Sequence, residues 1–439
     1  MCSSNHEPTI NKILFVCGSS NQKEPYLPIV DALKDRQTHK FDIFFITLDG
    51  MTTSRFTSFS SFKNIDKNFV NVFSVQDFKY DIVNILKKVN PDIIILPNDT
   101  SIPYMTFTIA AGHLKIPTLF CQTAAIGRSP FKASKNVINS LLWALDWHNA
   151  YIVLKLYHIL LRTLKQCDLS IYSRIHFILK DLSKRLTSMF MEGHGYCDKI
   201  AVINPYTKKM FIDDGVDPAK IIVTGFTKFD ALFDVPLSNK KSFCRKMGLD
   251  PNKPIVSLMT NCRVEHKLWK KRQRKEFIKS ILEQIAETNI QLIIKVHPNE
   301  DPTDYLDEAK NFDVVSIVSK TADIYEVMRA SDIIIPDPST TWLEAALLKK
   351  PLIFVDLFNE LPESFPPVAL GWPHIRNAKD IIPIMTKLME DEDFCRSIIK
   401  KSEEYLFDYL YIQDGQASKR VADLIIQMIE ESKRERNEN

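Results

Sequence analysis

The chain has 439 residues, of which 45% are hydrophobic and 25% charged, and its formal net charge is +3. The length suits two domains of ordinary size, and so small a charge excludes an argument for nucleic-acid binding from charge alone. Its eight cysteines include no Cys-x-x-Cys pair, which excludes the usual zinc-site spacing and is typical of a reducing compartment.

Two features that the sequence lacks bear on the location of the protein. The polar start, Met1–Pro8, lacks the apolar core of a signal peptide. No stretch approaches the roughly 18 uncharged apolar residues of a membrane span. We therefore expect a cytoplasmic protein, with the inner face of the cell membrane as a further possibility.

Short apolar runs alternate with amphipathic stretches along the chain. The runs are Lys12–Cys17, Asp42–Thr47, Asp92–Leu96, Thr118–Cys121, Lys199–Ile203, Ile221–Thr224, Ile255–Met259, Gln291–Val296, Asp313–Val318, Asp332–Ile335 and Leu352–Asp356. Continuous apolar runs predict strands that are buried on both faces, hence parallel strands with helical crossovers. The predicted fold class is α/β, with two Rossmann-like doubly wound lobes.

An internal echo supports two lobes over one large sheet. Asp92–Ile95 and Asp332–Ile335 share the letters Asp-Ile-Ile-Ile, and each is followed by an Ala-Ala pair and a proline that opens the next run. Prolines and polar residues cluster over Asp230–Pro254, which predicts the boundary. We expect an acceptor lobe over 1–235 and a nucleotide-donor lobe with a terminal helix over 236–439.

Residues of about 128–195 interrupt the alternation and predict a helical insertion in the first lobe, because they are too many for a bare loop. Ten Lys/Arg against four Asp/Glu give this segment a net charge of +6. Packing on the lobe with a solvated basic face is the favoured interpretation. The alternative is peripheral contact with an anionic membrane.

Polar residues that follow the predicted strands are the candidates for ligand binding. His297, after Gln291–Val296, can donate to a phosphate or glycosyl oxygen, although a His-Pro pair can also simply end a strand. After Asp332–Ile335, the hydroxyls of Ser339, Thr340 and Thr341 stand where a helix begins and can form an anion site with its free N–H groups.

Glu344 lies one turn further along and can accept both hydroxyls of a ribose; the alternative for this segment is an ordinary helix cap. Together, His297 and the segment Ser339–Glu344 predict a nucleotide-diphosphate pocket. No metal is required, because hydroxyls and the helix dipole can offset the developing charge.

These motifs give the second lobe a resemblance to the donor half of the glycosyltransferase-B superfamily, which includes UDP-N-acetylglucosamine 2-epimerases and polyol-phosphate and capsule-sugar transferases. Val223–Gly225 resembles its lobe junction. Asn98–Thr100 and Val296–Asn299 resemble the epimerase Gly-Asp-Thr and Val-His-x-Asn. The resemblance implies a UDP- or CMP/CDP-linked donor and a glycan or lipid-linked acceptor, with no nucleic-acid partner.

Departures from the epimerase pattern bear on the reaction. Gly18–Gln22 stands where the epimerases have Gly-Thr-Arg-Pro-Glu. Asn261–Glu265 stands where they have His-Arg-Arg-Glu-Asn, and this second resemblance makes Arg263 a candidate donor ligand. Gln122 stands where a catalytic glutamate would be, and glutamine cannot move a proton at C2. The Ser339-Thr340 pair resembles the transferase branch.

The first lobe is expected to bind the acceptor. Gly18 and Ser19 follow the first strand and can face the ligand. Asp99, after Asp92–Leu96, is either the general base for an acceptor hydroxyl or the cap of the next helix. The basic run Lys267–Lys275 can hold a diphosphate, but a solvated helix face is favoured.

The predicted function is transfer of a sugar or polyol phosphate from a nucleotide-activated donor, with Asp99 and His297 as catalytic residues. The predicted donor ligands are Gly18, Ser19, Arg263, His297, Ser339, Thr340, Thr341 and Glu344. Two alternatives stay open: an epimerase on the same fold, and a non-catalytic binding or scaffold protein.

Overall fold

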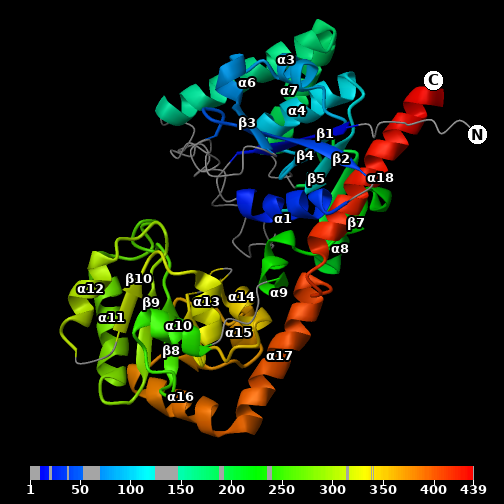
Figure 1. Cartoon of the computed structure of the whole chain (residues 1–439). Helices are drawn as coiled ribbons and strands as arrows, with labels where there is room; N and C mark the ends of the chain where they lie inside the picture. Colours follow the sequence, from blue (N-terminus) through cyan, green and yellow to red (C-terminus); the bar gives the residue numbers. More distant parts are fainter. Residues whose placement is uncertain are drawn as a thin grey trace, which may run out of the picture. The chain divides into compact units, whose positions relative to one another are not determined.

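The computed structural model describes residues 10–18, 22–36, 39–52, 70–123, 147–186, 192–234, 240–312, 316–337, 339 and 341–438. The chain divides into two compact units. One comprises Met1–Ala231 with Tyr409–Asn439, and the other comprises Leu232–Asp408. Figure 1 shows the elements of each unit.

The first unit contains a seven-stranded parallel sheet in the order β3-β2-β1-β4-β5-β6-β7. Its strands are β1 (Ile10–Cys17), β2 (Lys40–Thr47), β3 (Val70–Ser74), β4 (Ile93–Leu96), β5 (Thr118–Cys121), β6 (Lys199–Val202) and β7 (Ile221–Val223). Its helices are α1 (Lys23–Lys34), α3 (Ile82–Val89), α4 (Ile102–His113), α6 (Trp147–Gln166), α7 (Ile171–Leu186), α8 (Pro205–Asp213) and α18 (Ala417–Glu438).

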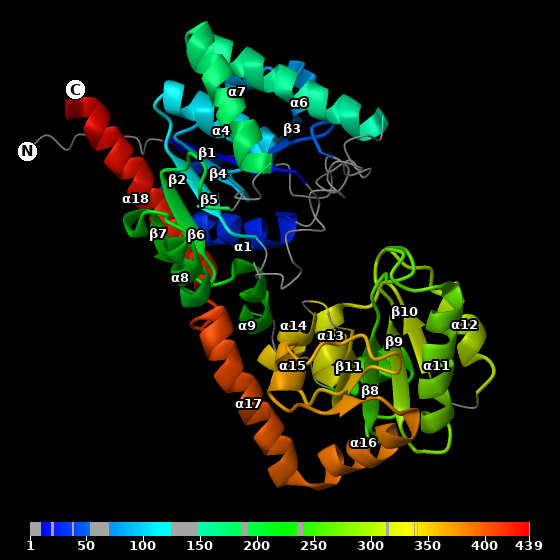
Figure 2. The ribbon, with the colours of Figure 1, turned by 180° about the vertical axis from the view of Figure 1, so that it is seen from behind.

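Helices cover both faces of this sheet, which is why its strands are apolar throughout. Apolar residues of α1 and α18 pack on one face. Those of α3, α4, α6 and α8 pack on the other. Figure 2 shows α6 and α7 across the sheet from α1 and α18.

The second unit contains a four-stranded parallel sheet in the order β10-β9-β8-β11 and a two-stranded sheet of β12 and β13. Its strands are β8 (Ile255–Met259), β9 (Gln291–Lys295), β10 (Ser316–Ser319), β11 (Ile333–Pro336), β12 (Phe354–Val355) and β13 (His374–Ile375). Its helices are α10 (Lys240–Met247), α11 (Lys271–Ile285), α12 (Thr303–Ala309), α13 (Ile324–Ala330), α14 (Thr341–Leu347), α15 (Pro366–Ala369) and α16 (Ile381–Glu390). The chain passes between the units at α9 (Ala231–Asp234) and within α17 (Glu392–Leu410).

The predicted α/β class with parallel sheets is confirmed; each predicted apolar run overlaps a strand, while β3 and β13 were not predicted. Two helices, α3 and α8, begin where a side chain replaces a missing backbone partner. Asp81 accepts the N–H of Asn84 at 3.0 Å to start α3, and Asn204 accepts the N–H of Thr207 at 2.6 Å to start α8.

The terminal helix differs from expectation. The sequence placed all of 236–439 in the second lobe, whereas Tyr409–Asn439 belongs to the first unit. The buried stripe of α18, which includes Val421, Ile425 and Ile429, packs with α1 on the seven-stranded sheet. An amphipathic pattern predicts that a helix has a buried face, but it does not say which sheet that face covers.

The helical insertion is confirmed where the structure describes it. Within 128–195, the helices α6 and α7 are present, while 128–146 and 187–191 lie outside the described residues. Among the described helices, none has both the length and the apolar character to cross a membrane.

Candidate functional site

Parallel strands bring their carboxyl ends to one edge of a sheet, and this edge of the second unit collects the predicted donor residues. Thr260 and Arg263 follow β8, His297 follows β9, and Asp337 and Ser339 follow β11. Thr260 and its neighbour Asn261 connect two of these segments: Thr260 bonds the His297 segment, and the Asn261 amide lies 3.4 Å from the Asp337 carboxylate.

His297 is half-buried and held at two points. Its backbone N–H donates to Oγ1 of Thr260 at 2.9 Å, and its Nδ1 accepts the N–H of Asn299 at 3.1 Å. In the neutral ring the proton is therefore on Nε2, which makes that atom a hydrogen-bond donor. Burial, followed by the charges of His266 and Lys295, lowers the pKa of His297, which favours this neutral form.

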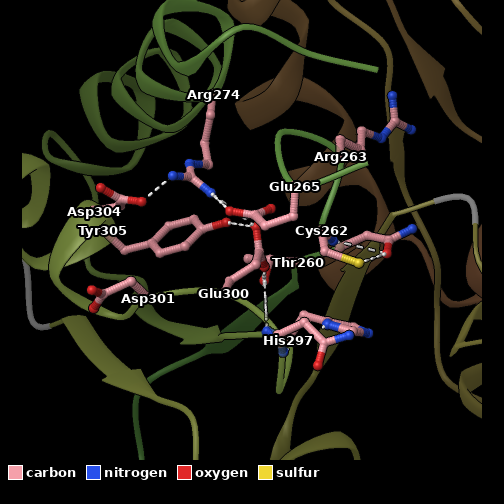
Figure 3. Close-up of polar contacts among 12 residues, drawn as sticks. Thr260, Cys262, Arg263, Glu265, Arg274, His297, Glu300, Asp301, Asp304 and Tyr305 are labelled. Carbon is pink, nitrogen blue, oxygen red and sulfur yellow. Dashed lines mark hydrogen bonds and ion pairs between the residues drawn. The ribbon is translucent and has the colours of Figure 1, made fainter. Parts of the chain in front are cut away.

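A buried acidic network lies beside His297 (Figure 3). Glu300 is 1% exposed. Its carboxylate accepts the hydroxyl of Thr260 and the hydroxyl of Tyr305 at 2.5 Å, and it lies 3.4 Å from Arg274 and 3.4 Å from the N–H of His297. Burial raises the pKa of Glu300, and the hydrogen bonds from Thr260 and Tyr305 oppose that rise.

Local sequence patterns did not predict this network. They favoured a solvated helix face for Lys267–Lys275, which fits the exposed Lys271 and Lys275. Arg274 is instead 5% exposed and pairs with Glu265 at 3.0 Å and with Asp304. A signal was present, because Arg274 precedes Ile278, Ile281, Leu282 and Ile285 at helical spacing and so shares their buried face.

The predicted donor ligand Arg263 is engaged with acids. Its Nε lies 2.7 Å from Asp337, and its Nη1 lies 2.5 Å from Glu360. Its guanidinium carbon lies 4.6 Å from the centre of the Trp269 ring. The indole N–H of Trp269 also donates to Glu360, at 2.7 Å. Arg263 is thus fixed at the edge of the sheet, with its charge offset by two carboxylates.

The residues around the start of α14 lie together. The hydroxyl of Ser339 donates to that of Thr341 at 3.0 Å, and the N–H of Thr341 lies 3.4 Å from the Ser339 oxygen. Glu344 lies in the first turn of this helix, is 3% exposed and already has an interaction partner. The fourth predicted residue, Thr340, lies outside the described residues.

A narrow hollow of about 30 Å³ opens among these segments. It is lined by residues that follow β8, β11 and β12, among them Thr260, Arg263, Asp337 and Asp356. Trp269 adds an aromatic wall. Of the predicted donor ligands, Arg263 lines this hollow, whereas His297, Ser339 and Glu344 do not belong to its lining.

In the first unit, Gly18 lies against a side chain. Its N–H donates to the Gln22 side chain at 2.7 Å. A Cβ atom at Gly18 would come within 2.3 Å of the Tyr104 hydroxyl. Close approach to Tyr104 therefore explains this glycine without a ligand. Ser19, the other residue predicted here, lies outside the described residues.

Asp99, predicted as a base or a helix cap, bonds a distant loop. It is 1% exposed, and its two oxygens accept the N–H groups of Gly193 and Gly195, each at 2.9 Å. Burial raises its pKa, and these two bonds oppose the rise. It does not cap α4, which has no side-chain cap bond; the turn before that helix is closed by Asn98, which accepts the N–H of Ser101 at 2.8 Å. Asp99 thus holds a loop, and its predicted role as a general base stays a prediction.

Gln122 is likewise committed to the fold. It is 3% exposed, and its side-chain oxygen accepts the N–H of Ile203 at 3.0 Å.

Over the described part of the chain, no group of three or more His, Cys, Asp or Glu residues could hold a metal ion.

Comparison with known families gives one match. The model of a family described as CDP-Glycerol:Poly(glycerophosphate) glycerophosphotransferase matches residues 175–427, more than half of the chain. That segment includes every predicted donor residue of the second unit. None of the curated proteins matches the sequence significantly.

Solved structures of two kinds of enzyme share this fold. The UDP-GlcNAc 2-epimerase of Neisseria meningitidis, bound to UDP-GlcNAc, is 17% identical, with a TM-score of 0.58 over 95% of this chain and 100% of that one. The wall teichoic acid polymerase TagF is 12% identical, with a TM-score of 0.54 over 96% and 89%. These likenesses confirm the predicted glycosyltransferase-B type of fold.

Proposed function

This chain belongs to the CDP-Glycerol:Poly(glycerophosphate) glycerophosphotransferase family, and from this premise we propose that it transfers glycerol phosphate from CDP-glycerol to an acceptor hydroxyl. The acceptor oxygen bonds to the phosphorus that carries glycerol. The bond from that phosphorus to the oxygen shared with CMP breaks, CMP leaves with this oxygen, and the hydroxyl proton passes to solvent. CDP-glycerol is thus the proposed donor for the predicted transfer of a polyol phosphate.

The orientation of His297 is the observation that carries this proposal. Because Nδ1 accepts the N–H of Asn299, the neutral ring can donate from Nε2 to a diphosphate oxygen. Such a bond strengthens as negative charge develops on the leaving CMP. The hydroxyl of Thr341, which accepts from Ser339, provides a further donor on the same edge of the sheet.

Glu344 is proposed as the ribose ligand. Its carboxylate is buried and has a partner already, so a ribose would have to replace that partner. Arg263 would offset the charge of the diphosphate only by exchanging one of its two carboxylates. Both roles support CDP-glycerol binding at the edge that holds His297.

A donor panel tests the function. CDP-glycerol, UDP-GlcNAc, a CMP-sugar and a GDP-sugar are each incubated with the protein and a synthetic lipid that carries glycerol phosphate. We expect acceptor-dependent CMP release from CDP-glycerol alone. Release of UDP with a C2-inverted sugar would instead establish an epimerase, and neither binding nor turnover across the panel would support a scaffold protein.

Two histidine variants locate the site. His297→Asn is expected to lower kcat for CMP release at least tenfold, because one donor to the developing charge is lost. His266→Asn is the matched control, since this exposed histidine lies on the segment after β8 and is expected to change kcat less than twofold. Equal losses in both variants would contradict the assignment.

The helices α6 and α7 support a proposed peripheral membrane contact. Seven of their large apolar side chains are 43–83% exposed: Tyr151, Leu154, Leu161, Ile171, Tyr172, Ile175 and Leu179. Ile171, Ile175 and Leu179 recur every four residues and so share one face of α7. With the net charge of +6 of residues 128–195, such a face suits an anionic lipid surface. A cytoplasmic location at the inner membrane face stays a prediction.

Vesicle sedimentation tests this contact. We expect binding to phosphatidylglycerol vesicles and little binding to phosphatidylcholine vesicles. The double variant Ile175→Ser, Leu179→Ser is expected to bind at least tenfold less. Phe407→Ser is the control, because Phe407 is 66% exposed on α17, in the other unit. Equal binding by the wild type and the double variant would exclude α7 as the contact.

A further inference from the structure

A buried chain of hydrogen bonds, which we call the relay, connects Thr260 and Glu300 to the segment that carries His297. Oγ1 of Thr260 accepts the backbone N–H of His297 at 2.9 Å and donates its own proton to the carboxylate of Glu300. Glu300 belongs to the same segment, since its N–H donates to the carbonyl of His297 at 3.0 Å. The turn from His297 to Glu300 is thereby closed on itself and tied to the end of β8 by one hydroxyl.

The carboxylate of Glu300 is fixed in turn. Tyr305, 1% exposed, donates to it at 2.5 Å, and Arg274 supplies a buried positive charge at 3.4 Å. Arg274 is itself paired with Asp304 and Glu265. A buried carboxylate keeps its charge only when it is paired and hydrogen-bonded, and these groups meet that condition.

None of these four side chains contacts the imidazole of His297. Thr260 and Glu300 contact the backbone N–H of His297, while Tyr305 and Arg274 contact Glu300. The contacts therefore determine where the Cα–Cβ bond of His297 points. The bond from the Asn299 N–H to Nδ1 then determines the rotation of the ring. Together they decide the direction of the Nε2–H.

We propose that Thr260 and Glu300 are positioning residues that aim the Nε2–H of His297 at the diphosphate of the donor. This rests on the proposed function, in which His297 contacts the donor. The hydroxyl of Thr260 is the coupling atom, because it alone both accepts from His297 and donates to Glu300. Loss of that hydroxyl leaves the backbone N–H of His297 with only its longer contact to Glu300, at 3.4 Å, so the imidazole stays in place but its Nε2–H no longer points at the diphosphate.

A double-mutant cycle tests the coupling. Thr260→Val replaces the hydroxyl by a methyl group of similar size, and Thr260→Ser keeps the hydroxyl. For CMP release from CDP-glycerol, Thr260→Val is expected to lower kcat about tenfold to a hundredfold, with KM nearly unchanged. Thr260→Ser is expected to restore kcat to within about threefold of the wild type. In the His297→Ala background, Thr260→Val is expected to cost less than twofold.

Equal loss of kcat in the wild-type and His297→Ala backgrounds would overturn the proposal. So would full activity of Thr260→Val, or an equal loss in Thr260→Ser. A lower unfolding temperature of Thr260→Val with unchanged kcat would also overturn it, since the relay would then be structural only.

A second readout does not depend on the donor. In protein with ¹³C- and ¹⁵N-labelled histidine, the His297 signals are identified by their loss in His297→Ala. We expect a single Nε2–H tautomer in the wild type and in Thr260→Ser, and a tautomer mixture in Thr260→Val. If the wild type turns over no CDP-glycerol, this result still decides whether Thr260 orients His297. An unchanged tautomer in Thr260→Val would refute the relay.

Discussion

The carboxylate of Asp230 accepts the backbone N–H of Ser418 at 2.6 Å, across 188 residues of sequence. It also accepts the N–H of Ala417 at 3.1 Å. These are the first two residues of α18, so Asp230 serves as the N-terminal cap of a helix far away in the chain. The bond ties the last segment of the chain to the first unit at the point where the second unit begins.

Asp230→Ala is expected to destabilise the first unit by about 1–2 kcal/mol, because two buried N–H groups lose their acceptor and the helix dipole loses a negative charge. Urea unfolding followed by circular dichroism measures the change. Asp213→Ala, an exposed aspartate of the same unit, is the control and should stay within about 0.5 kcal/mol. Equal effects would mean that the cap contributes nothing.

Arg274→Met is expected to destabilise the second unit by about 3–5 kcal/mol, since it leaves the buried Glu300 without its positive partner. Chemical denaturation measures the loss. The neighbouring Lys275→Met is the matched control: Lys275 is exposed and pairs with Glu308 at 2.9 Å. We expect its unfolding midpoint to be nearly that of the wild type. A small effect of Arg274→Met would show that Glu300 is protonated in the fold.

The free energy of unfolding should depend on pH in the way that the lowered pKa of His297 dictates. Burial and the charges of His266 and Lys295 lower its pKa below the ordinary value of 6.5, Lys320 acts in the same direction, and Glu265 opposes it. As the pH falls through 6.5, the unfolded chain therefore binds a proton at His297 before the folded protein does. This residue should destabilise the fold below pH 6.5 and have no effect on stability well above it.

Activity should follow the same titration. Protonation places a proton on Nδ1, which faces the N–H of Asn299, so the ring loses its orientation. We expect kcat for CMP release to be constant from about pH 8 to pH 6.5 and to fall only in more acid solution. In His297→Asn, the residual activity should lack that acid limb. A wild-type limb centred above pH 6.5 would argue that His297 is not the titrating group.

Two glycine substitutions should act in opposite directions. At Gly195 a Cβ atom would come within 2.0 Å of the Asp99 carbonyl oxygen, so Gly195→Ala should cost about 1–3 kcal/mol. At Gly112, in α4, a Cβ would meet nothing within 4 Å, and Gly112→Ala should stabilise by about 0.5–1 kcal/mol. Thermal unfolding of both variants measures this. Equal changes would mean that Asp99 does not confine the loop.

The sequence by itself determined the class of fold and the edge of the sheet at which the candidate ligand residues lie. Apolar runs such as Ile255–Met259 mark buried parallel strands, since burial on both faces leaves no polar position. Polar residues that follow those runs, such as His297 and Ser339, must then lie at the carboxyl edge. Both inferences rest on periodicity and chain order, which are local properties.

Only the tertiary structure decided what each polar residue touches. Asp99 and Gly195 are 96 positions apart, and Thr260 and His297 are 37 apart, so no local pattern pairs them. The same holds for α18, whose apolar stripe would fit either sheet. Burial of an ionic group depends on partners that converge from several elements. Helical spacing could place Arg274 on the buried face of α11, but only the tertiary structure brought Glu300, Asp304 and Tyr305 together with it.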